Sequence, residues 1–318
     1  MNIPDRLDFA KLSLDNKPSF VHLSVDKDGV TEIRPSDLNA ERYFTESTER
    51  TRTELRTLVV NSDGLNIQRL DDFRNQINAS QTPIQFLDTD SYERVLQESE
   101  LKSDSEGIYI AELRMAFVRR NIGLEALNGV AITESFAVHE AAHSSHIEAP
   151  IRVVHKTTGR FRKKSVIEMS RSRSGFNTAP LRNGSTYGYL FEEGYAELER
   201  GLYVQYHDLA GQFTAGASNY ELVKDSPIPL HYWYKREESE KIALTIAPGA
   251  LAATVLEILT KQDPSLISTL RKGRQDVHGL RNIAQRINGL IPGLYPELQH
   301  ANESTIINAL GKVTKHYR

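Results

Sequence analysis

The sequence predicts an α+β protein, on three observations. Residues 18–37 alternate apolar and polar side chains around an Asp-Gly pair, which is typical of a β-hairpin. A strand, a helix and a second strand are indicated in turn from Pro83, and the pattern beyond Pro229 is mostly helical. A chain of 318 residues, 39% of them apolar, can bury one elaborate core or two modest ones. We expect an N-terminal attachment, a core and a helical C-terminal part, which are residues 1–80, 81–210 and 211–318.

The N-terminal attachment is polar. After the hairpin, Ser36 and Asp37 are expected to cap a charged helix at about residues 38–60, and another helix is expected near residues 68–77. The many Glu, Arg and Thr residues indicate that this part packs through a narrow apolar stripe.

The core is expected to begin with a strand, IQFLD, at residues 84–88. Asp90 is expected to cap the following helix, because Glu93 stands at capping-box spacing from it. The β-rich run GIYIAELRMAFVRR, residues 107–120, then predicts a second strand.

Two helices and a hairpin are expected in the rest of the core. Residues 132–146 have an apolar helical side, with Thr133 as the expected cap and Pro150 closing the segment. A hairpin at residues 151–170 turns at Thr-Thr-Gly-Arg, and a second helix spans about residues 189–206.

The composition excludes several kinds of site and partner. The chain has no cysteine, so disulfides, thiolate catalysis and Cys-based zinc sites are ruled out, and any metal must be held by His, Asp or Glu. A formal net charge of -3 creates no global field that recruits nucleic acid or a membrane, and we expect neither as a partner.

A cytoplasmic location is expected. The first thirty residues carry charges throughout and lack the apolar region of a secretory signal. The most apolar long stretch, residues 242–259, contains Pro248, Gly249 and Glu257, and we interpret it as a buried helix rather than a membrane span.

The chemistry of the chain is indicated by the motif His139-Glu140-x-x-His143 within the expected helix at residues 132–146. Residues four apart lie on one helical face, so both imidazoles can point at one ion. Two neutral ring nitrogens suit Zn²⁺, and Glu140 stands where a carboxylate can act as general base on an ion-bound water. The alternative is a helix with one histidine in the core and one facing solvent.

A catalytic zinc keeps three protein ligands and an open position for water, so a third ligand is needed. The segment Glu193-Gly-Tyr-Ala-Glu197 follows fifty residues after His143, on the second expected helix. Its two carboxylates share a face, so Glu193 can ligate while Glu197 accepts a hydrogen bond from a ligand imidazole. Glu192 is an alternative ligand, although only Glu193 has a carboxylate partner four residues later.

With these two segments the chain resembles the gluzincin group of zincin metallopeptidases, in which a glutamate on a second, antiparallel helix is the third zinc ligand. The resemblance covers about residues 83–318. It implies Zn²⁺, peptide-bond hydrolysis and a zincin-like catalytic domain, with a small twisted sheet over the active-site helix and a mainly helical C-terminal subdomain. The gap between His143 and Glu193 is longer than this subgroup leads us to expect, and the hairpin at residues 151–170 must fill it. The metzincin pattern is absent, because Ala149 stands where its third histidine belongs.

Substrate alignment and oxyanion stabilisation require further groups. Zincins commonly align a peptide along an edge strand, and residues 107–120 are the candidate here, with an interior strand as the alternative. The oxyanion needs a donor besides the metal. We favour His231 or Tyr234, although an aromatic cluster flanked by prolines is also typical of a packed wall. The other candidates are Tyr187, Tyr189 and Arg236.

Residues 152–182 carry nine Arg or Lys residues against one acid, Glu168. We interpret them as a solvated hairpin face, with contacts to acidic peptides or to phosphates as the alternative.

The sequence therefore predicts a cytoplasmic zinc metallopeptidase that acts on a peptide or protein substrate, with the oligomeric state open. Zinc is held by His139, His143 and Glu193, while Glu140 is the base and Glu197 orients a ligand histidine. The alternative function is a catalytically silent zincin-fold regulatory or binding protein.

Overall fold

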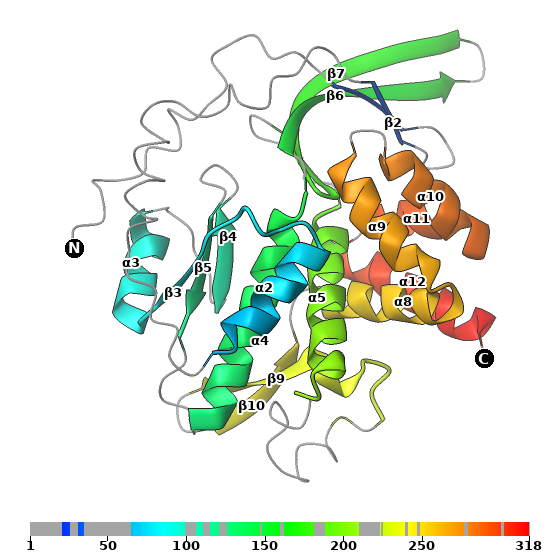
Figure 1. The fold of residues 1–318 in the computed structure, drawn as a ribbon. Coiled ribbons are helices and arrows are strands. Elements are labelled where there is room, and N and C mark those ends of the chain that lie inside the picture. The colour runs from blue at the N-terminus through cyan, green and yellow to red at the C-terminus, as the bar shows by residue number, and fades with distance from the viewer. Residues whose placement is uncertain are drawn as a thin grey trace. The chain divides into compact units, whose positions relative to one another are not determined.

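The computed structural model is α+β (Figure 1). The residues it describes are 21–25, 31–34, 65–98, 106–110, 115–120, 126–146, 148–159, 162–180, 188–209, 223, 225–238, 241–246, 249–276, 279–299 and 302–317. Two compact units are formed by discontinuous stretches of chain, and the boundary between them crosses helix α5 (Tyr189–Tyr206) between Tyr195 and Ala196.

The first unit is built on a small mixed sheet of strand order β3-β5-β4. Strands β3 and β5 are parallel, and both α3 and β4 lie between them in the sequence. Strand β4 runs antiparallel to β5. Helix α4 packs against β4 and β5, and α2 packs along α4 (Figure 1). The elements are α2 (Ile67–Gln76), β3 (Ile84–Leu87), α3 (Thr89–Glu98), β4 (Gly107–Ile110), β5 (Met115–Arg119) and α4 (Ala126–Ser144).

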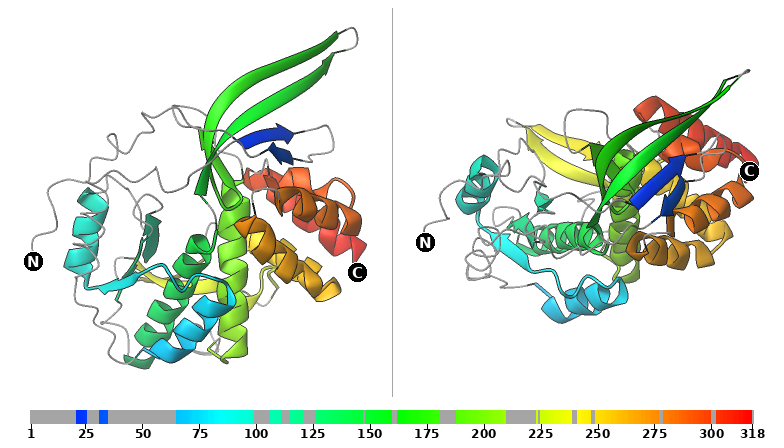
Figure 2. Two further views of the ribbon diagram at one scale, coloured as in Figure 1. Left: turned by 45° about the horizontal axis from the view of Figure 1, so that its top comes forward. Right: turned by 90° about the horizontal axis from the view of Figure 1, so that it is seen from above.

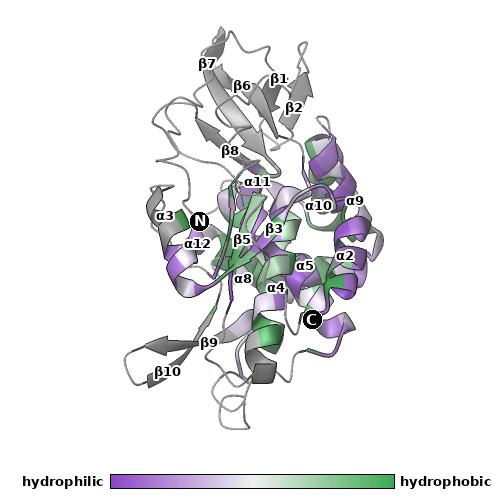
Figure 3. Cartoon of the chain, turned by 60° about the vertical axis from the view of Figure 1, so that its left-hand side comes forward, coloured by the Kyte–Doolittle hydropathy of each residue, from purple (hydrophilic) through white to green (hydrophobic). Residues whose placement is uncertain are grey.

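Strand β5 is the buried centre of this sheet. Met115, Ala116, Phe117 and Val118 have no exposed surface, and β5 is largely hydrophobic in Figure 3. A strand buried on both faces is continuously apolar rather than alternating, which accounts for the run MAFV. The unit also holds the C-terminal part of α5, the short helix η2 (Leu230–Tyr232) and the antiparallel pair β9 (Trp233–Glu238) and β10 (Lys241–Ile246).

The second unit combines a sheet of order β2-β1-β6-β7-β8 with a group of helices (Figure 2). Strand β1 pairs antiparallel with β2 and parallel with β6, and the long strands β6 and β7 form a hairpin. The strands are β1 (Val21–Val25), β2 (Thr31–Arg34), β6 (Glu148–Gly159), β7 (Arg162–Ser174) and β8 (Asn177–Pro180). The helices are α8 (Ala250–Gln262), whose first residue belongs to the first unit, and then α9 (Ser265–Gln275), α10 (Gly279–Leu290), α11 (Leu294–Gln299) and α12 (Glu303–His316).

Several sequence predictions are confirmed. The hairpin at residues 18–37 corresponds to β1 and β2, and the hairpin at residues 151–170 corresponds to β6 and β7. The helices expected near residues 68–77 and 189–206 are α2 and α5, and the strand at residues 84–88 is β3. The helix expected at residues 38–60 lies outside the described residues.

Other expected boundaries are wrong. Residues 107–120 contain two strands, β4 and β5, which pair antiparallel with Ile110 opposite Met115. Helix α3 is capped by Asp88 rather than Asp90, since the Asp88 carboxylate accepts the Ser91 N–H at 2.8 Å.

Helix α4 also differs from its expected bounds. It includes residue 126, so Thr133 lies inside it and is not a cap. It ends at Ser144, and Pro150 lies in β6, where its missing N–H is tolerated at the start of a strand.

The stretch at residues 242–259 is not one helix. Its first part is β10 and its second part is α8, with Pro248 between them. The β9–β10 pair therefore interrupts the helical pattern expected beyond Pro229. In the described ranges, no helix has both the length and the apolar composition that a membrane crossing requires.

Candidate metal centre

Helix α4 carries the two motif histidines on one face. The Nε2 atoms of His139 and His143 lie 2.9 Å apart, and the two rings meet edge to face with centroids 4.7 Å apart. His139 is 8% exposed and His143 is half-buried. The neighbouring Ala141 and Ala142 are fully buried, so small side chains border the motif.

Helix α5 runs antiparallel to α4, as two contacts within the first unit establish. The Tyr203 hydroxyl donates a hydrogen bond to Glu134, and Glu197 Oε1 lies 2.8 Å from His139 Nδ1. From the first contact to the second, the position on α4 advances by five residues while the position on α5 goes back by six, so the helices run in opposite directions. One further turn in the same register brings Glu193 opposite His143, since α5 is a continuous helix.

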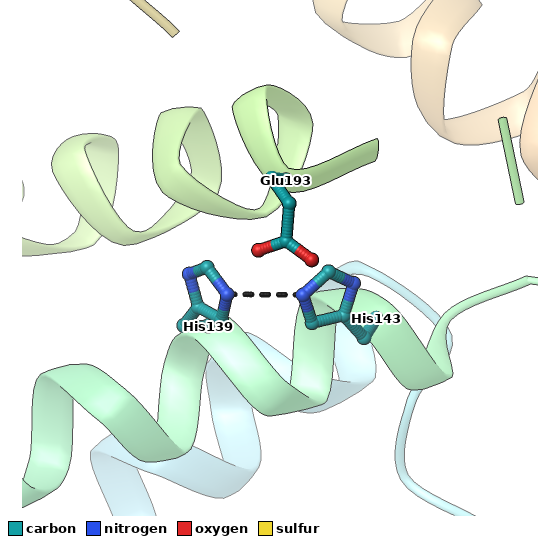
Figure 4. A group of neighbouring side chains, drawn as sticks. All are labelled: His139, His143 and Glu193. Atoms are coloured by element: carbon teal, nitrogen blue, oxygen red, sulfur yellow. Dashed lines mark hydrogen bonds between the residues drawn. The ribbon is translucent and has the colours of Figure 1, made fainter. Parts of the chain in front are cut away.

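Glu193 completes a convergent group with the two histidines (Figure 4). One ligand atom from each of His139, His143 and Glu193 lies within 4.8 Å of the others. Among the described residues this is the group whose donor atoms suit a metal ion. Two ring nitrogens and one carboxylate oxygen are a donor set typical of zinc.

Glu197 holds His139 from behind and is itself held by Arg200. Arg200 Nε donates to Glu197 Oε2 at 2.8 Å, and both side chains are 1% exposed. Burial by itself would raise the pKa of Glu197, but the Arg200 charge and the contact with His139 outweigh it and lower that pKa to about 2. A carboxylate at Nδ1 favours the tautomer of His139 that leaves Nε2 free of its proton.

Glu140 lies beside the cluster and against the sheet. It is 5% exposed, and a Cβ atom at Gly107 would stand 2.8 Å from its Cγ and Oε1 atoms. The first residue of β4 is thus a glycine at a point where the strand backbone approaches the motif glutamate closely.

Glu192, the alternative ligand, is occupied elsewhere. Its Oε2 accepts the Phe176 N–H at 2.8 Å and Arg274 Nε at 3.3 Å, while its Oε1 pairs with Arg274 Nη2. Both carboxylate oxygens of Glu192 therefore serve an internal ion pair.

The structure describes the surroundings of His231 but not the side chain of Tyr234. His231 is 9% exposed, its Nε2 lies 3.1 Å from Gln205 Nε2, and its ring abuts Gly201. Gly201 stands eight residues beyond Glu193, about 12 Å along the helix axis at 1.5 Å per residue. Tyr234 lies in β9, and its side chain is outside the described residues, so its role as an oxyanion donor stays a prediction.

Sequence reasoning missed three arginines that form ion pairs with glutamates of α4 and α5. Arg200 stands three residues after Glu197, a helical spacing that could have indicated the pair. Arg69 pairs with Glu134 through two contacts of 2.7 Å, and burial together with the bond to Glu134 raises the pKa of Tyr203. Arg274 reaches Glu192 over 82 positions, a separation for which the sequence offers no local signal.

Comparisons with protein-family models, curated proteins and solved structures find no match for this chain.

Proposed function

We propose that the protein is a zinc-dependent peptide hydrolase of gluzincin type. The observation that carries this proposal is the convergence of His139, His143 and Glu193, with Glu197 set behind His139. If the two histidines were a chance feature of α4, nothing would favour a glutamate of α5 opposite them. A second glutamate one turn further along α5, in contact with a histidine ring, would be equally unexpected.

The donor set fits a zinc ion. The two Nε2 atoms already face each other at 2.9 Å, close to the roughly 3.3 Å expected for two nitrogens about 2.05 Å from one tetrahedral ion. In the structure the two nitrogens share a hydrogen bond, and a bound cation would take the place of its proton. When bound, zinc would supply a Lewis acid that polarises a carbonyl group and makes water more acidic.

The chain's own residues would divide the remaining work. Glu140 would take a proton from the attacking water and pass it to the leaving amine, because it directly follows His139 in α4 and is only 5% exposed. Glu197 would keep the His139 ring oriented through its Nδ1 contact.

Strand β4 would align the substrate. It stands at an edge of the sheet among the described strands, and its first residue, Gly107, abuts Glu140. A peptide that paired with this edge would run past the Glu140 carboxylate in an extended conformation.

The test separates metal binding from turnover. The purified chain is analysed for zinc and incubated with a broad peptide library, next to Glu140→Gln and Glu193→Ala variants. We expect about one zinc per parent chain, full zinc content without cleavage for Glu140→Gln, and strongly reduced zinc content for Glu193→Ala. Cleavage by Glu140→Gln at the parental rate would reject Glu140 as the base. Stoichiometric zinc in a parent that cleaves nothing would favour the catalytically silent binding protein.

A further inference from the structure

One guanidinium group bridges the two ligand-bearing helices. Arg274 lies at the end of α9 and has no exposed surface. Its Nη1 donates to the Ser145 hydroxyl at 2.8 Å, while its Nε donates to Glu192 Oε2 at 3.3 Å and its Nη2 pairs with Glu192 Oε1. Ser145 directly follows α4, and Glu192 lies in the first turn of α5.

Both anchor residues are next to proposed ligands in the sequence. Ser145 stands two positions after His143, and Glu192 stands one position before Glu193. The guanidinium is planar and rigid, so the distance between its outer nitrogens fixes the distance between the two anchor points. The separation of His143 and Glu193 therefore depends on the position of the Arg274 side chain, which belongs to the C-terminal helices.

The bridge has little freedom to shift. The Arg274 guanidinium carbon lies 4.1 Å from the centroid of the Tyr195 ring and 5.5 Å from that of Phe176. Glu192 is fixed in turn by the Phe176 N–H, and the preceding Gly175 has a φ of 61°. A Cβ atom at Gly175 would come within 2.2 Å of Glu192 Oε2, so only glycine leaves the carboxylate its place.

The position of α9 is also defined closely. A Cβ atom at Gly273 would stand 2.2 Å from Ile283 Cδ1, and one at Gly279 would stand 2.2 Å from the Gly273 Cα. The segment that carries Arg274 thus packs backbone to backbone on the start of α10. This close packing fixes the position of the Arg274 backbone.

We propose that Arg274 is a positioning residue of the metal centre, which holds the end of α4 and the first turn of α5 at the separation at which His143 and Glu193 share one ion. This inference rests on the proposed zinc site. It assigns to the C-terminal helices a share in metal affinity although they contribute no ligand.

The test compares Arg274, which is buried, with Arg69, which is half-buried and contacts the same pair of helices. Arg274→Lys keeps the positive charge but loses the planar fork, and Ser145→Ala removes only the contact at the end of α4. Arg69→Lys is the matched control, because Arg69 also bridges α4 and α5, through Glu134 and Tyr203, but away from the ligands. Zinc affinity is measured by competition with a chromophoric chelator, coordination geometry by the visible absorption of the Co²⁺-loaded protein, and folding by circular dichroism.

We expect Arg274→Lys to bind zinc about 10- to 100-fold more weakly and to alter the Co²⁺ spectrum, which is the size of effect seen when supporting groups of metal ligands are changed. Ser145→Ala should show a smaller loss in the same direction. Arg69→Lys should melt at a lower temperature with zinc affinity within about twofold of the parent.

Each outcome has a distinct meaning. If the parent and Ser145→Ala bind zinc equally tightly with the same Co²⁺ spectrum, and a folded Arg274→Lys does so too, the positioning role is rejected while the proposed function stands. If Arg274→Lys does not fold, the zinc affinity of Ser145→Ala alone decides: weaker binding supports the positioning role, and unchanged binding rejects it. If the parent binds neither metal, the proposed function and this inference fall together.

Discussion

Replacement of Arg200 by Met tests the electrostatics behind His139. Arg200 and Glu197 form a pair in which both side chains are 1% exposed, and Arg200 Nη2 also donates to the His231 carbonyl at 3.2 Å. Removal of the guanidinium would leave the Glu197 carboxylate in a site that water does not reach. Breaking one side of a buried pair costs about 3–5 kcal/mol in unfolding free energy, far more than a surface pair is worth.

The expected loss is measurable as a fall in melting temperature. At about 2 °C per kcal/mol for a chain of this size, Arg200→Met should melt roughly 6–10 °C below the parent. The measurement is made with a chelator present, because a metal that binds only the folded state would add its own stabilisation.

A double-mutant cycle supplies the control. Glu197→Gln alone leaves the Arg200 charge buried and should also be costly, whereas Arg200→Met combined with Glu197→Gln removes both charges. The double variant should therefore be more stable than the sum of the single effects predicts, by about 2 kcal/mol or more. A cost below about 1 kcal/mol for Arg200→Met, or strict additivity in the cycle, would show that the pair does not hold Glu197 in its charged form.

Two further predictions concern helix packing and pH. Gly194→Ala should lower the unfolding free energy by about 1–3 kcal/mol, because the new Cβ would stand 2.4 Å from Ala252 Cβ. Gly311→Ala has open space around it and should stabilise α12 by about 0.5–1 kcal/mol. Urea unfolding compares the two variants, and equal shifts of one sign would contradict the packing. Hydrogen bonds from Arg286 and Ser265 lower the pKa of Asp263 to about 2, so the stability that Asp263 contributes is complete above pH 4 and is lost as the pH falls toward 2. Asp263→Asn should therefore be less stable than the parent by about 0.5 kcal/mol at pH 6, and the two should be equally stable near pH 2, as measured by thermal unfolding. A stability difference that grows as the pH falls would refute this sign.

The local parts of the fold were predictable from the sequence. Helix α5 and strand β3 follow from residue pattern alone, and the β1–β2 hairpin follows from its turn residues. The errors arose where two elements join in one apolar run. In residues 242–259, a strand and a helix are both continuously apolar, so hydrophobicity does not mark the boundary between them, and only Pro248 does so.

The candidate site was predictable where helical spacing places residues together. His139 and His143 are four apart, as are Glu193 and Glu197, so each pair shares a face whatever the tertiary structure. The choice of Glu193 over Glu192 rested on the same rule, and the ion pair of Glu192 with Arg274 supports it. Arg274 itself was beyond prediction, because its partners are set by helix packing between distant parts of the chain.

His143 and Glu193 stand fifty positions apart, which raises the question of how two proposed ligands so distant in sequence come together. The intervening chain leaves and returns along an antiparallel meander: Glu148 at the start of β6 pairs with Ser174 at the end of β7, and β8 turns back directly from there. Because the strands pair on both sides of an irregularity between Val154 and Lys156, a longer or shorter hairpin would return the chain to the same place beside Glu148. The length of this insertion is thus independent of the distance between His143 and Glu193, and an unusual gap in the sequence is not by itself an argument against the proposed shared ion.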